Sequence, residues 1–207
     1  MSIEFLLRLA NESGGVIYLM FVLLFIAIFI IIERLKFLAD MKKVGLQLIT
    51  LCQNSKSVNK ESLQAFQESH AEIPSVRLVN VALRENIEGL TREDLDGKLE
   101  EEIMHQVPRL DQTVWMLDTI ITLAPLLGLF GTIIGMFNAM FGLTDIQNSA
   151  AQISSGISEA LVSTAFGLII AMLGLSFFNN INTQIRFLVH QMETLKVMIV
   201  NRRHLFE

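Results

Sequence analysis

The sequence predicts an all-α membrane protein in which three transmembrane helices carry long cytoplasmic helical extensions. Of its 207 residues 52% are apolar and only 18% are charged, whereas charged residues make up about 25% of an average soluble domain. The charges are also unevenly placed, because 26 of the 37 charged side chains fall within residues 33–118. Long charge-free runs flank this polar insert, which is the pattern of a chain that crosses a membrane.

The first predicted span covers residues 15–32, which are 18 uncharged residues. At 1.5 Å per residue a helix of this length reaches about 27 Å, enough to cross the hydrocarbon core. A signal peptide is the competing interpretation. However, the preceding segment, residues 1–14, carries acidic as well as basic side chains. Glu33 and Arg34 also follow where a small-residue cleavage site would lie, so we interpret the run as a retained anchor.

The second predicted span, residues 119–143, contains 25 uncharged residues. The third is placed at residues 155–178, and Glu159 is its only ionisable residue. Residues 144–154 form the short loop between these two spans. Three crossings place the two ends of the chain on opposite sides of the membrane.

The distribution of basic residues predicts the orientation. Lysine and arginine are enriched after the first and third spans, are absent from the 144–154 loop, and occur once in the N-terminal 14 residues. Under the positive-inside rule the insert 33–118 and the tail 179–207 are cytoplasmic, whereas residues 1–14 and the loop are periplasmic. The basic residues that follow the two spans include Arg34, Lys36, Lys42, Lys43, Arg186, Lys196, Arg202 and Arg203.

The insert and the tail have helical patterns. Thr91 to Asp94 resembles a capping start, and the apolar stripe after it runs directly into the second span, which predicts one long helix with a kink at Pro108. Residues 33–72 also have a helical pattern, with a break near residues 54–59, and the tail is predicted to continue the third helix. The apolar stripes consist of Leu95, Leu99, Ile103, Val107, Leu110, Val114 and Leu117 in the insert, and Ile185, Leu188, Met192, Leu195 and Ile199 in the tail.

Several functional classes are disfavoured. The four histidines all lie outside the spans, so an intramembrane hydrolase would have only Glu159 as a base at membrane depth. No phosphate-binding loop and no zinc-ligand spacing is present, and Cys52 is the single cysteine. The net charge of −5 without a basic patch argues against nucleic acid. We therefore expect no enzyme activity, no metal and no cofactor.

Glu159 is the most informative residue. A carboxylate deep in a membrane helix costs roughly 3 kcal/mol, and such residues usually face a bundle interior or a water-filled cavity. The alternative is a residue solvated at the outer end of the third span. Desolvation raises the pKa of a carboxylic acid, so the group can be neutral or charged at membrane depth, as a proton relay requires.

Small residues follow one face of the second and third spans, which allows close backbone approach between helices in lipid. These stripes alone indicate packing and nothing more. Thr132 and Thr164 have hydroxyls that either hold water or pass a proton near Glu159, or merely bond their own backbone one turn back. The predicted packing residues are Gly128, Gly131, Gly135, Ala160 and Gly167, with Ser163 in the same stripe.

Two motifs carry a family resemblance. They are Ala-Pro-Leu-Leu-Gly-Leu-Phe-Gly-Thr at 124–132 and Gly-Ile-Ser-Glu-Ala-Leu-Val-Ser-Thr-Ala-Phe-Gly at 156–167. With them the chain resembles the MotA/TolQ/ExbB proton-channel family, and within it ExbB most and TolQ next. The three-span topology and the length of the cytoplasmic insert are also similar to that family.

The resemblance implies a pentamer in the bacterial inner membrane that encloses an ExbD- or TolR-like single-span partner and energises a TonB- or TolA-like protein. It also implies that Glu159, Thr132 and Thr164 line the space around the partner helix. Phospholipid is a further expected partner. The alternative is a non-conducting oligomeric scaffold that only gathers partner helices. Such a scaffold would have no need of Glu159.

Overall fold

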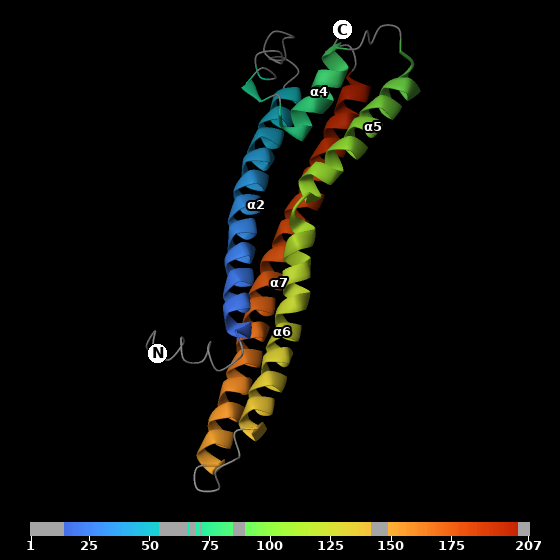
Figure 1. Ribbon diagram of the computed structural model, residues 1–207. Helices are drawn as coiled ribbons and strands as arrows, with labels where there is room; N and C mark the ends of the chain where they lie inside the picture. The colour runs from blue at the N-terminus through green and yellow to red at the C-terminus, as the bar shows by residue number, and fades with distance from the viewer. Residues whose placement is uncertain are drawn as a thin grey trace. The chain divides into compact units, whose positions relative to one another are not determined.

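The computed structural model describes residues 15–53, 66, 69–70, 72–84, 90–141 and 149–202. Within these residues the secondary structure is entirely helical, which confirms the predicted all-α class (Figure 1). The described helices are α2 (Val16–Gln53), α4 (Pro74–Arg84), α5 (Arg92–Asp111), α6 (Val114–Phe141) and α7 (Ser149–Asn201).

Three helical stretches are long and apolar enough to cross a membrane. They lie in Val16–Gln53, Arg92–Met140 and Ile153–Asn201, in the chain order that the sequence predicts. The three-span membrane fold is therefore confirmed. The exact span limits given above stay predictions, because helix ends and membrane boundaries need not coincide.

The chain divides into two compact units, each assembled from separate parts of the sequence. We call the first the membrane unit, which comprises residues 1–32 and 113–179, and the second the polar unit, which comprises residues 33–112 and 180–207. The helices α2 and α7 contribute to both units, whereas α4 and α5 belong to the polar unit and α6 to the membrane unit. Each unit is described separately below.

The membrane unit has an apolar interior and an apolar exterior. Inside, Ile17 of α2 packs with Val162 of α7, and the exposed ring of Phe21 lies 5.0 Å from the half-buried ring of Phe166. Outside, many large apolar side chains are exposed, with Phe25 at 79%. An exterior of this kind is unfavourable in water and suits lipid or the apolar faces of other membrane helices.

The polar unit has a conventional apolar core. Of the insert stripe, Leu95, Leu99, Ile103 and Leu110 are buried, and Val107 is half-buried. All five residues of the tail stripe are buried as well. The helical periodicity in the sequence therefore identified the core-facing sides of α5 and α7.

The start of α5 confirms the predicted capping motif. Thr91 Oγ1 accepts a hydrogen bond from the Asp94 backbone N–H at 3.1 Å, and the Thr91 backbone N–H donates to Asp94 Oδ2 at 3.2 Å. These reciprocal bonds satisfy two of the donors that a helix N-terminus leaves unpaired. The hydrogen bonds from Thr91 also hold the pKa of the Asp94 carboxyl below its ordinary value.

Helix α5 leads into α6 as the sequence predicts, with a short break at the junction that the sequence did not indicate. The helix ends at Asp111 and resumes at Val114, with a turn at residues 112–113 in which the Met116 N–H donates to the Thr113 carbonyl at 3.2 Å. Pro108 lies within α5, and the bond that its missing N–H removes is the one to the carbonyl of residue 104, on the N-terminal side of the proline. By contrast, α7 is continuous over 53 residues, so the tail does extend the third helix.

The C-terminal end of α2 is capped from α7. Arg202 Nη1 donates to the carbonyls of Cys52 and Gln53 at 2.5 and 3.3 Å, and a cation at a helix C-terminus is favourable because the terminal carbonyls carry partial negative charge. Burial raises the pKa of the Cys52 thiol. The predicted break near residues 54–59 lies outside the described residues.

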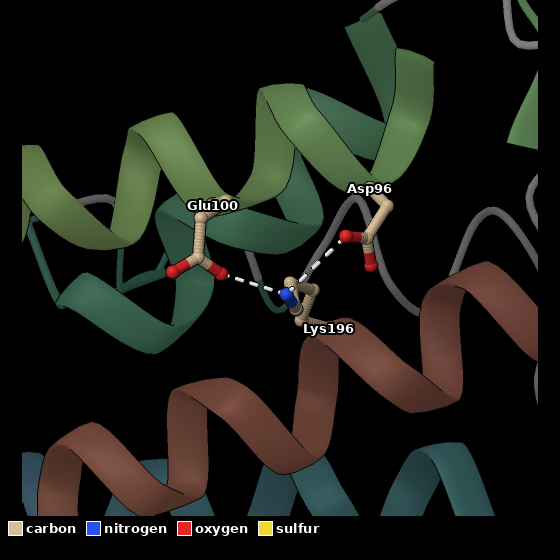
Figure 2. Close-up of polar contacts among 3 residues, drawn as sticks. All are labelled: Asp96, Glu100 and Lys196. Atoms are coloured by element: carbon tan, nitrogen blue, oxygen red, sulfur yellow. Dashed lines mark hydrogen bonds and ion pairs between the residues drawn. The ribbon is translucent and has the colours of Figure 1, made fainter. Parts of the chain in front are cut away.

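An ion-pair network joins α5 to α7 within the polar unit (Figure 2). Lys196 Nζ lies 2.6 Å from Glu100 Oε2 and 3.4 Å from Asp96 Oδ2. The lysine is mostly buried, with 16% of its side chain exposed, whereas the two carboxylates are about half exposed. The hydrogen bond to Glu100 raises the pKa of Lys196 above its ordinary value of 10.5.

We expect Lys196→Met to lower the free energy of unfolding by about 1 kcal/mol at pH 7, because half-exposed ion pairs contribute little each. The folded-state pKa of Lys196 lies above the unfolded value, so the pair stabilises fully below pH 10.5 and its contribution is lost as the pH rises through the folded-state pKa. Thermal unfolding of the detergent-solubilised chain at pH 7 and pH 11 measures both effects. Lys43→Met removes an exposed charge from α2 and serves as the control. An equal loss in the two variants would contradict the role of the network.

Candidate functional site

Helices α6 and α7 approach each other closely because small residues face one another. A Cβ added to Gly128 would lie 3.0 Å from the Thr164 Cα, and one added to Gly135 would lie 3.3 Å from the Ala160 Cβ. Backbones can come this close only where side chains are minimal. The same close approach occurs at Gly131 against Ser163, at Gly156 against Ala139 and at Gly167 against the Ala124 carbonyl.

The two threonines use their hydroxyls differently. Thr164 Oγ1 donates across the helix pair to the Gly128 carbonyl at 3.2 Å. Thr132 Oγ1 donates within its own helix to the Leu129 carbonyl at 2.6 Å. Both hydroxyl protons are therefore engaged by backbone, and each oxygen retains lone pairs that can accept from water or from a carboxylic acid.

Glu159 lies within helix α7, and its side chain is outside the part of the chain that the structure describes. The neighbouring residues Ala160 and Val162 nevertheless show what the turn that carries Glu159 packs against. Ala160 lies against Gly135 of α6, and Val162, two residues further along, packs with Ile17 of α2. Its role and those of Thr132 and Thr164 stay predictions.

Ser163 is a feature that sequence reasoning did not separate from the packing residues. Its side chain is completely buried, next to Gly131. Its Oγ has no hydrogen-bond partner among the described residues. A buried hydroxyl without a hydrogen-bond partner costs about 1–3 kcal/mol. The feature of the sequence that pointed to Ser163 was its position four residues after Glu159.

The chain matches the family model of the MotA/TolQ/ExbB proton channel family over residues 63–194, which is more than half of its length. The chain belongs to this family. Members have names such as ExbB and TolQ, so the resemblance drawn from the two motifs is confirmed.

Three relatives in this family differ in how similar they are to the chain and in how much of it they match. The chain is 33% identical over 184 residues to the putative biopolymer transport protein ExbB-like 3 of Synechocystis, covering 86% of each protein. It is 26% identical to the putative biopolymer transport protein ExbB homolog of Methanothermobacter thermautotrophicus, over 90% of this chain and 67% of that protein. It is 32% identical to the Tol-Pal system protein TolQ of Pseudomonas aeruginosa, over 42% of this chain and 38% of that protein.

Family membership and the three apolar helices together establish the broad class of the protein. It is a multi-pass inner-membrane protein of a proton-channel family that serves energy-transducing membrane complexes. Members of this MotA/TolQ/ExbB family are associated with channels and transport rather than with enzymatic catalysis.

Proposed function

We propose that this MotA/TolQ/ExbB family member is the stator and channel subunit of an inner-membrane motor driven by the proton-motive force. In this proposal it surrounds an ExbD- or TolR-like single-span partner and energises a TonB- or TolA-like protein for outer-membrane transport or maintenance. The observation that carries the proposal is a single carboxylate, Glu159, on a turn of α7 that packs closely against Gly135 of α6.

The proposed chemistry is reversible protonation of Glu159. A carboxylic acid at membrane depth is costly when charged and tolerable when neutral, so its protonation state can change as a proton passes. Thr132 of α6 and Thr164 of α7 supply oxygen lone pairs, and both hydroxyls are oriented by hydrogen bonds to backbone carbonyls. These three side chains form our proposed proton pathway.

A partner is required on chemical grounds. One carboxylate per chain is too few to carry protons from one membrane face to the other, so a second titratable group must come from another helix. Each proton that moves down 100 mV releases about 2.3 kcal/mol, and several are needed for substantial mechanical work. A homopentamer around a central partner helix would place five copies of Glu159 around that second group.

The apolar exterior of the membrane unit supports assembly. The exposed face of α6 includes Leu126, Ile133 and Met140, which lie away from the glycine face that contacts α7. Such a face can contact neighbouring subunits as well as lipid. The proposed orientation has the N-terminus in the periplasm and the polar unit in the cytoplasm, as the distribution of basic residues predicts.

The decisive experiment is co-purification of the full chain with a candidate single-span partner that carries an intramembrane aspartate. We expect native mass spectrometry to count five copies of this chain around partner helices, and cross-linking to place the partner next to α6 and α7. A complex without a central partner helix would contradict the motor. An assembly that binds the partner but passes no protons would favour the scaffold.

A further inference from the structure

The polar unit contains a pocket that the proton pathway does not use. It encloses about 530 Å³ and is lined by residues of α2, by the start of α4 and by the end of α5. A volume of this size falls within the range of small-molecule sites. The polar lining residues include Arg34, Asp40, Gln106 and Arg109.

Gln106 is one of the lining residues, and its buried side chain has an unsatisfied acceptor. Its side chain is 2% exposed, and its amide Nε2 donates to Glu102 Oε1 at 2.5 Å. Its Oε1 has no hydrogen-bond partner among the described residues. Because a buried carbonyl oxygen without a donor is costly, this atom calls for a ligand that carries N–H or O–H groups.

Both basic and acidic side chains line the pocket. Arg34 is 4% exposed, with its Nε 3.3 Å from Glu33 Oε2 and its guanidinium 5.2 Å from the centre of the Phe37 ring. Arg109 and Asp40 also line the pocket and form no ion pair within the described ranges. A ligand with a phosphate and an ammonium group would complement this combination.

The predicted span limits place several of the lining residues next to a membrane surface in the sequence. Glu33 and Arg34 are the first polar residues after the uncharged run 15–32, and Gln112 lies just before α6, which contains the second span. Residues at the ends of membrane spans lie at the level of the lipid headgroups. The apolar part of the lining, which includes Phe37, Met41 and Pro74, can accept the glycerol portion of a lipid.

We propose that this pocket binds the headgroup of an amine-bearing zwitterionic phospholipid of the phosphatidylethanolamine class. Arg34 and Arg109 bind the phosphate, because guanidinium groups match phosphate oxygens in geometry and charge. The ammonium donates to Gln106 Oε1 and pairs with Asp40. Phosphatidylcholine lacks the N–H donors, and phosphatidylglycerol lacks the cation. This inference goes beyond the proposed motor and does not depend on it.

Native mass spectrometry of the delipidated full-length chain in detergent tests the proposal, with the three lipids added at matched acyl composition. We expect phosphatidylethanolamine to be retained about tenfold better than phosphatidylcholine, the factor that one charge-assisted hydrogen bond supplies. It should also be retained better than phosphatidylglycerol. Equal retention of phosphatidylethanolamine and either other lipid would overturn the proposal.

Three variants test whether the lipid binds in this pocket. Arg109→Met removes an exposed side chain from the pocket and should reduce phosphatidylethanolamine retention at least about fivefold. Lys36→Met removes the same charge from an exposed position of α2 outside the lining, and should leave retention unchanged. Gln106→Met should abolish the preference over phosphatidylcholine, and circular dichroism checks that the variant folds. Unchanged retention in Arg109→Met, or equal losses in the two charge variants, would overturn the assignment to this pocket.

Discussion

Glu159→Gln is expected to reduce proton-driven activity to the level of membranes without the protein, while assembly with the partner remains intact. Glutamine has nearly the same shape and can form hydrogen bonds, but it cannot bind and release a proton. If Glu159 is the titrating group of the third span, no other carboxylate on this chain can replace it at membrane depth. Proton flux into proteoliposomes that contain the chain and its partner, followed with a pH-sensitive dye, measures the effect.

Glu193→Gln is the matched control for this experiment. Glu193 lies on the same helix, α7, in the polar unit, where its carboxylate is about half exposed and lies 3.7 Å from His190 Nδ1. Its substitution removes one charge without affecting the membrane span, so flux should stay at the level of the unmodified protein. Normal flux or normal client transport with Glu159→Gln would refute the proton pathway, whereas loss of the complex itself would indicate a structural role.

The general architecture was accessible from the sequence because it depends on local patterns. Uncharged runs of about 20 residues indicated the spans, and the spacing of Leu95, Leu99 and Ile103 indicated the buried side of α5. The capping motif at Thr91 likewise requires only residues three apart. The break at residues 112–113 was not predicted, because Gln112 and Thr113 are not helix breakers and Pro108 perturbs the turn that precedes it.

The details of the site depend on which residues of different helices meet, and periodicity does not provide that. The bond from Thr164 to the Gly128 carbonyl joins residues 36 positions apart, and Lys196 is 96 positions from Glu100. The unpaired hydroxyl of Ser163 becomes visible only when Gly131 is placed against it. Sequence reasoning could therefore identify polar residues in the spans and could not assign their partners.

Gly167→Ala is expected to lower the stability of the membrane unit by about 2 kcal/mol, because an added Cβ would overlap the backbone carbonyl of Ala124, which cannot rotate away. Helices α6 and α7 would have to separate, and that movement would also displace the turn that carries Glu159. Thermal unfolding in detergent measures the stability, and the flux assay measures the functional loss.

Substitution of a second glycine separates the effect of packing on stability from the effect of helix propensity. Gly97 lies on α5, and a Cβ added there would meet nothing within 4 Å, so Gly97→Ala should raise stability by roughly 0.5–1 kcal/mol through its higher helix propensity alone. Gly135→Ala should fall between the two, because a Cβ added there would lie 3.3 Å from both the Ala160 Cβ and the Gly156 carbonyl oxygen, a tight contact without the overlap found at Gly167. If Gly167→Ala behaves like Gly97→Ala, the two helices are not held at the distance that the glycines permit, and the close packing proposed to position Glu159 is absent in the membrane.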